Sequence, residues 1–422
     1  MQIGLLGLGT VGTGVVELIE KNMDTICRRL EEPIGVKKIL VKNLNKKRPF
    51  FAEGKITDKI EDILEDSDIS IVVEVMGGEE PAFTYIRRAL TLGKHVVTAN
   101  KEVISKHGRE LLDLAQSKNV NLFFEASVGG GIPIIRPLKQ CLAANEILKV
   151  MGILNGTTNY ILCQMAEKNK SFEEALKEAQ EEGYAESDPT ADIKGMDAAR
   201  KLAILSSIAF NTRITPDQVY TQGIDGIDLV DLEYARELGY KIKLVAAGKR
   251  HKSGIEVCVT PVLLNQRHPL AGVGGVFNAI LVEGDAVGRV MFYGQGAGKM
   301  PTASAVVADI MDVVRNKNSG KMYCTCYNED KILDPGMATA RFYIRLRADD
   351  KPGVLSKISG ALGDNQISLW KVFQKNTVNG TAEIVMLTYD VPFRNLIIAL
   401  DRVKSFQQVK EIASVIRVEE EM

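Results

Sequence analysis

Short apolar runs alternate with helical apolar periodicity over the first third of the chain. Continuous apolar runs predict strands buried on both faces, and apolar residues every three to four positions predict amphipathic helices. The predicted strands are residues 3–7, 37–43, 69–77, 95–101 and 120–127, and the predicted helices are residues 11–24, 83–93 and 104–119. Strands that alternate with helices favour a parallel sheet with right-handed crossovers. Residues 1–132 therefore predict an α/β domain with a Rossmann-like, doubly wound parallel sheet.

The pattern changes after residue 132. Residues 133–300 mix helices and strands without regular alternation, and they predict an α+β domain for substrate binding and dimerisation. We expect the apolar helix at 302–316 to return to the first domain. Residues 317–340 are polar and rich in turn formers, which predicts a linker. The order of elements in residues 341–422 is strand, helix, strand, strand, helix, strand, which is typical of a ferredoxin-like fold.

Composition and charge narrow the classes of partner. The 422 residues carry a formal net charge of −1, so no overall field draws the chain to nucleic acid or to an anionic membrane. No apolar run approaches the ~18 residues of a membrane span, and the N-terminus lacks the features of a secretory signal. The scattered cysteines and histidines show no ligand spacing for a transition metal, and the cysteines suit a reducing compartment. We therefore expect a cytoplasmic protein that acts on a small molecule.

A glycine-rich turn links the first predicted strand to the first predicted helix. Gly7, Gly9 and Gly12 form the pattern G-x-G-x-x-G. The first glycine permits a tight turn, the second lets the backbone approach a pyrophosphate, and the third lets helix and strand pack closely. The N-terminus of the helix then faces the anion. Because the motif opens an alternating β/α series, it favours dinucleotide binding over a plain structural turn.

The end of the second predicted strand bears on the choice of cofactor. An NAD site usually has an acidic residue there for the ribose 2′-hydroxyl, whereas this chain has Lys42 and Asn43. The basic residues Lys46, Lys47 and Arg48 follow. A basic cluster can pair with a 2′-phosphate, so NADP is favoured. A solvated charged loop and a pocket that accepts either NAD or NADP both remain open.

Residues 183–201 place many charges at the entry of an apolar helix. Asp197 and Lys201 are four residues apart on this predicted helix and share a face. The other acids of the segment are Glu186, Asp188 and Asp192. Charges that enter a buried helix are costly unless they are paired or used. The residues alone leave a catalytic site and a structural ion network equally open.

The chain resembles the homoserine dehydrogenase family in several segments. These are GLGTVG at 7–12, VEVMGG at 73–78, TANK at 98–101, EASVGGGIPII at 125–135, LNGTTNYIL at 154–162, AESDPTADIKGMDAARKLAIL at 185–205 and YGQGAGKMPTASAVV at 293–307. The C-terminal stretch DDKPGVLSKISGAL, residues 349–362, is similar to ACT domains. The resemblance implies an enzyme of threonine, methionine and isoleucine biosynthesis. Such an enzyme interconverts L-homoserine and L-aspartate 4-semialdehyde by hydride transfer with NAD(P).

The resemblance also implies roles for the charged residues. Lys201 aligns with the family's proton-transfer lysine, and Asp197 aligns with an acid that binds substrate or orients the reacting oxygen. Glu186 and Asp192 align with substrate contacts, and Lys101 aligns with a lysine near both nicotinamide and substrate. A positioned lysine can serve as the base for a hydroxyl proton and as the acid of the reverse reaction.

Two further sets of residues follow from the resemblance. The implied dinucleotide contacts are Thr10, Val11 and Gly298. The implied sodium ligands, largely through backbone carbonyls, are Glu125, Val128, Gly130 and Ile132. A tight turn between domains, without any ion, remains an alternative for the glycine-rich segment 129–131. The chain departs from the family at Asn43, where an acidic or basic residue is common, so the resemblance leaves NAD against NADP open.

The ACT-like segment implies an amino-acid effector and an oligomer. By resemblance the effector is threonine, acting as feedback inhibitor, with Asn365 and Gln374 as candidate contacts. ACT domains pair at their edges, which implies a homodimer or homotetramer. A ferredoxin-like dimerisation module without a ligand remains open, because a fold alone does not fix function.

Two other functions remain open from the sequence. A semialdehyde dehydrogenase that forms a thioester needs an activated cysteine. Cys141 and Cys163 are the nearest candidates, although neither has a histidine nearby in the sequence. The second alternative is a non-catalytic amino-acid sensor that retains a Rossmann domain, and the acid–lysine cluster argues against it.

Overall fold

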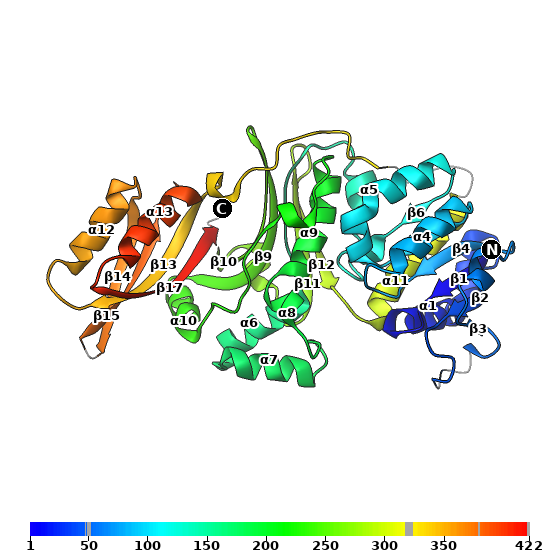
Figure 1. Ribbon diagram of the computed structural model, residues 1–422, viewed down its shortest axis with the longest axis horizontal. Helices are drawn as coiled ribbons and strands as arrows, with labels where there is room; N and C mark the ends of the chain where they lie inside the picture. The colour runs from blue at the N-terminus through cyan, green and yellow to red at the C-terminus, as the bar shows by residue number, and fades with distance from the viewer. Residues whose placement is uncertain (47, 49–51, 317–323, 379, 420–422) are drawn as a thin grey trace. The chain divides into compact units, whose positions relative to one another are not determined.

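The computed structural model describes residues 1–422 except 47, 49–51, 317–323, 379 and 420–422 (Figure 1). The chain forms two compact units that interleave along the sequence. The first unit contains Met1–Val150, Arg200–Pro216 and Phe277–Glu329, and the second contains Met151–Ala199, Asp217–Val276 and Asp330–Met422. Two of the boundaries fall within strand β7 (Ile147–Ile153) and helix α9 (Met196–Ala209). The domain boundaries predicted from the sequence group the residues differently and stay a prediction.

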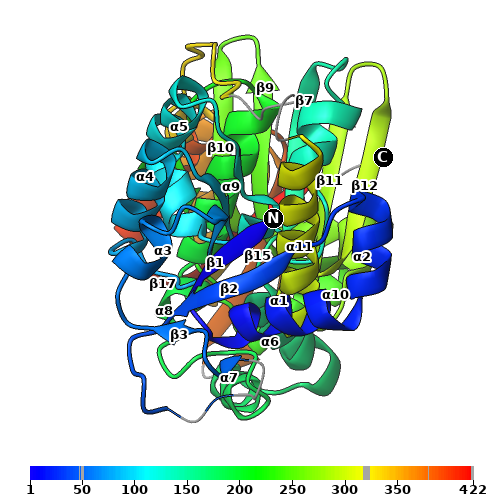
Figure 2. The same ribbon diagram turned by 90° about the vertical axis from the view of Figure 1, so that its right-hand side faces the viewer.

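The first unit contains a parallel sheet in the order β3-β2-β1-β4-β5-β6. Strands β1, β2 and β3 of this sheet are labelled in Figure 2. Its strands are β1 (Gln2–Leu6), β2 (Gly35–Leu40), β3 (Ile56–Thr57), β4 (Ile69–Glu74), β5 (His95–Thr98) and β6 (Leu122–Phe123). The helices between them are α1 (Thr10–Lys21), α2 (Met23–Leu30), α3 (Glu61–Leu64), α4 (Ala82–Thr91) and α5 (Lys101–Ser117). The strand order reverses between β1 and β4, as in the Rossmann fold, so the predicted doubly wound sheet is confirmed. Ligands of such sheets bind at this switch point, beyond the carboxyl ends of the strands.

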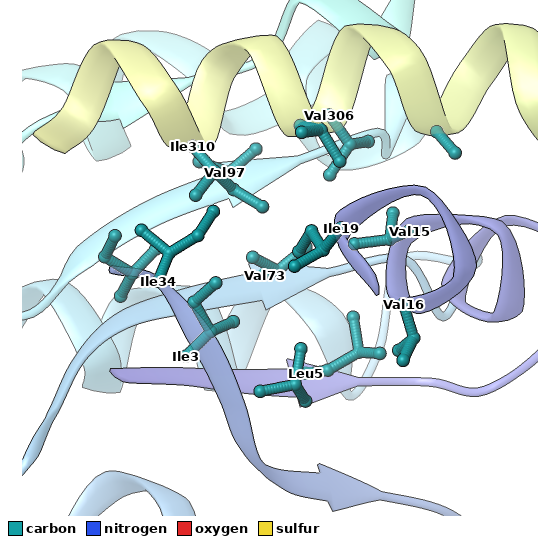
Figure 3. Close-up of a cluster of buried hydrophobic side chains, with 14 of the residues drawn as sticks. Ile3, Leu5, Val15, Val16, Ile19, Ile34, Val73, Val97, Val306 and Ile310 are labelled. Carbon is teal, nitrogen blue, oxygen red and sulfur yellow. The ribbon is translucent and has the colours of Figure 1, made fainter. Parts of the chain in front are cut away.

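Helix α11 (Lys299–Arg315) completes the core of this unit although it lies far along the chain. Val306 is buried in the same apolar cluster as Val15 of α1 (Figure 3). A Cβ atom on Gly14 would lie 2.8 Å from the backbone oxygen of Lys299, so α1 and α11 meet backbone to backbone. The packing of α11 therefore fixes the helix whose first turn follows the glycine motif.

The elements between the Rossmann sheet and the C-terminal segment are mixed, as predicted. The first unit has the antiparallel pair β11 (Phe277–Gly284) and β12 (Gly288–Gln295). The second unit has the antiparallel pair β9 (Tyr240–His251) and β10 (Gly254–Asn265), the short strand β8 (Tyr220–Thr221), and helices α6 (Gly156–Lys168), α7 (Phe172–Glu181), α8 (Thr190–Ile193) and α10 (Leu229–Glu237). Among the described residues, no helix is both long enough and apolar enough to cross a membrane.

The C-terminal segment has the predicted ferredoxin-like order. Its main elements are β13 (Thr339–Asp349), α12 (Val354–Asp364), β14 (Leu369–Val378), β15 (Thr381–Thr388), α13 (Phe393–Lys404) and β17 (Val409–Glu419), and the two-residue strand β16 (Val391–Pro392) pairs with β13. The strands lie in the order β17-β13-β15-β14 with antiparallel neighbours. Arg345 of β13 is fully buried, and its Nε donates a 2.7 Å hydrogen bond to the buried carboxylate of Asp231 on α10. This pair joins the segment to the rest of the second unit.

Candidate active site

The glycine motif forms a tight turn between β1 and α1. Gly7 has a φ of +102°, in the region that favours glycine. A Cβ on Gly12 would lie 2.1 Å from the oxygen of Gly7, so no other residue fits there. A Cβ on Gly9 would meet no atom within 4 Å. Open space therefore lies in front of Gly9, beside the first turn of α1 at Thr10 and Val11, where backbone N–H groups have no partner within the helix.

A buried carboxylate organises the next two strand ends. Glu74 ends β4, and its oxygens accept hydrogen bonds from the Met76 N–H at 2.8 Å and the Thr98 hydroxyl at 2.6 Å. Burial raises the pKa of Glu74, although these donors oppose the shift. Asn100 follows β5 and accepts from two amides in the first turn of α5, which begins at Lys101. The half-buried Lys101 is thus the first residue of a helix whose start is fixed by the Asn100 side chain at the end of β5.

The loop after β2 carries the basic residues considered for a 2′-phosphate. Lys42, Asn43 and Lys46 are exposed. The Arg48 guanidinium instead bonds back to carbonyl oxygens of its own loop, including that of Lys46 at 2.8 Å. Arg48 therefore stabilises the loop rather than extending from it. Lys47 lies outside the described residues.

The segment considered for sodium is organised by the side chain of Glu125. Its carboxylate is buried and accepts the N–H groups of Ile134, Ile135 and Arg136 at 2.6, 2.8 and 2.9 Å. The predicted strand at 120–127 is therefore wrong beyond Phe123: the chain turns into a 3-10 helix at Glu125–Ser127 because the carboxylate faces these amides. The side chain of Glu125 is thus held by three backbone amides, and its backbone carbonyl accepts the Val128 N–H at 3.4 Å.

The turn after this 3-10 helix packs closely on the chain beyond β12. A Cβ on Gly130 would lie 2.4 Å from the oxygen of Gly296, so only glycine fits at position 130. Val128 and Ile132 flank the turn and are buried. Gly298, with a φ of +130°, precedes α11 in the same unit. Among the described residues, no group of three or more His, Cys, Asp or Glu side chains could hold a metal ion.

Arg136 links this segment to α11 through buried charges. Its guanidinium lies 2.7 Å from the carboxylates of Asp309 and Asp312. Burial raises the pKa of Asp309 to about 7, although Arg136 opposes the shift. The ion network therefore fixes the loop against the helix that completes the Rossmann core.

The acidic segment before α9 is brought together by one amide that the sequence analysis did not single out. Asn155 caps the start of α6, and its Nδ2 donates to Asp192 at 2.7 Å and to the buried Asp197 at 2.9 Å. Its Oδ1 accepts the Thr158 N–H at 2.9 Å. The LNGTTNYIL motif contains this residue, and an asparagine before a helix is a capping signal. Glu186 is exposed in the loop before α8, and the Gln180 amide donates to its backbone carbonyl at 3.1 Å.

Lys201 lies one turn after Asp197 on α9 and is half-buried. The preceding residue, Arg200, forms a 3.2 Å ion pair with Glu102 in the first turn of α5. The helix that carries Lys201 is thereby tied to the helix that begins at Lys101. Within the first unit, the two candidate lysines thus belong to helices in direct contact.

The two candidate effector contacts, Gln374 and Asn365, occupy different places in the C-terminal segment. Gln374 lines a cavity of about 350 Å³, together with the turn at 349–355, and its amide donates to Asp350 at 3.0 Å. Asn365 instead closes the end of α12, and its amide donates to the Ala361 carbonyl at 2.9 Å. Asn365 does not line the cavity.

Comparison with known proteins identifies the family. Residues 7–125 match the family described as "Homoserine dehydrogenase, NAD binding domain", and residues 133–311 match the family described as "Homoserine dehydrogenase". The homoserine dehydrogenase of Bacillus subtilis is 41% identical over 99% of this chain and 98% of its own length, and that of Synechocystis is 43% identical over 99% of both. The chain belongs to the homoserine dehydrogenase family.

The solved structures agree with this assignment. The crystal structure of a homoserine dehydrogenase from Thiobacillus denitrificans aligns with a TM-score of 0.94 and 42% identity, over 100% of this chain and 98% of its own. A hyperthermophilic archaeal homoserine dehydrogenase, solved in complex with NADPH, aligns with a TM-score of 0.62 and 27% identity. That alignment covers 74% of this chain and 97% of the archaeal chain, so part of this chain has no counterpart there.

The enzyme is therefore an NAD(P)-dependent oxidoreductase that transfers hydride between L-homoserine and L-aspartate 4-semialdehyde. The predicted activity is confirmed, and so is the use of a nicotinamide dinucleotide. The two other functions considered from the sequence, a thioester-forming dehydrogenase and a non-catalytic sensor, are set aside.

Alanine substitutions at Gly12 and Gly9 should separate folding from cofactor binding. Gly12→Ala forces a Cβ into the Gly7 carbonyl and should lower the free energy of unfolding by about 1–3 kcal/mol. Gly9→Ala meets open space, so stability should change by less than ~0.5 kcal/mol. Its methyl group fills the space that a pyrophosphate would use, so affinity for the reduced dinucleotide should fall about tenfold or more. Urea denaturation and fluorescence titration measure the two effects, and unchanged affinity in Gly9→Ala would contradict this placement of the pyrophosphate.

Proposed function

We propose that Lys201 transfers the proton during hydride transfer in this enzyme. The supporting observation is its position one helical turn after Asp197, whose buried carboxylate is held by the Asn155 amide. A bound nicotinamide would supply the hydride acceptor for homoserine oxidation and the hydride donor for the reverse direction. The Lys201 amine takes the hydroxyl proton of homoserine, and the Lys201 ammonium returns it to the aldehyde oxygen of the semialdehyde.

The acids of the same segment fit the amino-acid part of the substrate. Asp192 and Asp197 share one amide donor, so two carboxylates converge on a small region. Such a region suits an ammonium group, because ionised pairs form strong hydrogen bonds. In this proposal Asp192 and the exposed Glu186 bind the substrate ammonium, and Asp197 orients the reacting oxygen. Lys101, at the positive end of α5, stabilises negative charge on that oxygen.

Replacing Lys201 with methionine should abolish turnover and spare cofactor binding. Methionine keeps the length of the side chain but cannot carry a proton, so kcat should fall by about 10²–10⁴. Fluorescence titration with the reduced dinucleotide should give an affinity within about threefold of the wild type. The matched control is Lys194→Met, whose exposed ammonium pairs with Asp225, and it should retain turnover. A Lys201→Met enzyme with wild-type kcat would reject the assignment.

NADP is the cofactor that this site fits best. The exposed Lys42 follows β2, at the place where a dinucleotide's ribose lies in this fold. In the described part of this loop Lys46 is also exposed, whereas the Arg48 guanidinium bonds to the Lys46 carbonyl. NADPH in the complex of the hyperthermophilic archaeal relative supports the proposal.

Charge reversal at Lys42 should change cofactor preference. Lys42→Glu removes the partner of the 2′-phosphate and adds repulsion, so kcat/KM with NADPH should fall about tenfold, equivalent to ~1.4 kcal/mol. The value with NADH should hold or rise. Lys59→Glu, at another exposed lysine, controls for net charge. If NADPH and NADH respond equally to Lys42→Glu, Lys42 does not contact the 2′-phosphate.

We also propose a sodium ion at the loop that follows β6. Its ligands are backbone carbonyls of Glu125, Val128, Gly130 and Ile132. The donor set suits a hard monovalent cation, since the Glu125 carboxylate is already satisfied by three amides. The ion would stiffen the loop that Glu125 and Gly130 shape.

The C-terminal segment is proposed to be an ACT domain that binds threonine. The supporting observation is the cavity at the start of α12, where backbone N–H groups suit a carboxylate and Asp350 suits an ammonium group. Gln374 holds Asp350 in that cavity, whereas Asn365 acts as a cap outside it. We further propose a homodimer or homotetramer that works in the cytoplasm, in keeping with the free cysteines.

Replacing Gln374 should weaken inhibition by threonine and leave basal turnover unaffected. Gln374→Ala frees Asp350 and removes a wall of the cavity, so the threonine concentration for half-inhibition should rise about fivefold or more. Turnover without threonine should stay unchanged. Asn365→Ala is the matched control and should keep the wild-type threonine response. Inhibition that is identical in wild type and Gln374→Ala would remove Gln374 from the effector site.

A further inference from the structure

Two cysteines separated by one residue lie outside the site described above. Cys324 and Cys326 belong to the segment that follows α11, and both are half-buried free thiols. The Cys326 thiol lies 3.9 Å from the Ser207 carbonyl on α9. The two cysteines line a cavity of about 30 Å³ within the first unit, together with Lys139 and Arg213.

The two sulfur atoms are in direct contact and unequal. The Cys324 sulfur accepts hydrogen bonds from the thiol and the backbone N–H of Cys326, which lower the pKa of Cys324 to about 6. The same contact raises the pKa of Cys326. Lys139 adds positive charge that favours the Cys324 thiolate and Asp113 opposes it, while Arg213 favours the charged form of Cys326. The half-buried Cys324 sulfur thus favours the thiolate form, and its neighbour keeps a proton.

We propose that Cys324 and Cys326 form a redox-active dithiol that hydrogen peroxide converts into an intrachain disulfide. The Cys324 thiolate attacks a peroxide oxygen, the O–O bond breaks, and a sulfenic acid forms as hydroxide leaves. The Cys326 thiol then attacks the Cys324 sulfur, the S–S bond forms, and the sulfenic oxygen departs as water. Overall, two thiols and one peroxide give one disulfide and two waters.

The chain geometry permits this ring and makes it reversible. Two residues of chain span at most ~7 Å, so the Cα atoms stay near the ~4.4–6.8 Å range that a disulfide requires. A ring this small is strained, and strained disulfides are the readily reduced ones. The cavity of about 30 Å³ has room for a molecule of the size of water or hydrogen peroxide.

The dithiol contacts the helix that carries Lys201, and the neighbouring Arg213 contacts the helix that carries Lys101. Cys326 contacts Ser207 on α9, six residues beyond Lys201. Arg213, beside the cysteines, donates to the Ser105 carbonyl on α5 at 2.6 Å, near Lys101. Closing the disulfide pulls Cys326 towards Cys324 and changes the packing against α9. We therefore propose that the oxidised enzyme has a lower kcat.

Peptide mass analysis of the full-length enzyme tests the disulfide. After treatment with one equivalent of hydrogen peroxide, the peptide that contains 324–326 should lose two hydrogen atoms, and dithiothreitol should restore them. Cys326→Ser should instead leave a sulfenic acid on Cys324 that dimedone traps, while Cys141→Ser, which removes an exposed thiol elsewhere, should behave as wild type. Faster oxidation at Cys141 or Cys27, or sulfinic acid on Cys324 without a disulfide, would overturn the proposal.

Turnover measured on the same samples tests the link to α9. The kcat of wild type should fall at least about twofold in proportion to the disulfide formed and recover with dithiothreitol. Cys324→Ser should have a kcat near that of wild type before treatment, and peroxide should not change it. A disulfide that leaves kcat unchanged would overturn the link to α9. These outcomes are independent of the assignment of Lys201, because the peptide masses do not depend on turnover.

Discussion

A carboxylate that is buried must accept hydrogen bonds from the protein, because an unpaired buried charge is costly. This requirement shapes the candidate active site of the enzyme. Glu74 accepts hydrogen bonds from the Met76 N–H and the Thr98 hydroxyl, and the second bond links the carboxyl ends of β4 and β5. Glu125 accepts hydrogen bonds from the three consecutive backbone N–H groups of residues 134–136, and these bonds bend the loop after β6. Asp197 accepts a hydrogen bond from the Asn155 amide, which links the start of α9 to the start of α6. Three segments that carry candidate functional residues are thus each anchored by a buried acid.

These anchors also explain how far the sequence was informative. Local rules predicted what depends on neighbours: the glycine turn, the alternating strands and helices, and the shared face of Asp197 and Lys201. Asn155 was missed because its partners Asp192 and Asp197 lie 37 and 42 residues away, and no spacing rule reaches across a fold.

The wrong strand boundary at 120–127 has a similar origin. The apolar run up to Phe124 fits a strand, and periodicity alone contains no sign that the run should stop. The strand ends at Phe123 because the Glu125 carboxylate meets amides that come about ten residues later. The predicted helix at 11–24 likewise ends early, at Lys21, and a second helix starts at Met23. Tertiary hydrogen bonding thus decided a boundary that propensity left open.

The environment of Cys163 shows why this cysteine does not suit thioester chemistry. The Cys163 thiol is buried, and the Lys243 ammonium lies 3.2 Å from its sulfur while also bonding to Asn159 and the Val273 carbonyl. These contacts satisfy Lys243 and hold the cysteine as part of the packing. A nucleophilic cysteine instead needs access to substrate and a base to take its proton. The local structure therefore agrees with the family assignment.

The proposed chemistry places opposite charges on opposite parts of the substrate. Lys101 is the first residue of α5, where the helix dipole adds positive potential to the ammonium, so this position suits an oxygen that gains negative charge. Asp192 accepts from the same Asn155 amide as Asp197 and suits the substrate's ammonium group. Lys201 shares a helix with Asp197, so the acid that orients the oxygen and the amine that moves its proton keep a fixed spacing. Because a helix holds that spacing more rigidly than a loop, a shift of α9 as a whole would change both groups together.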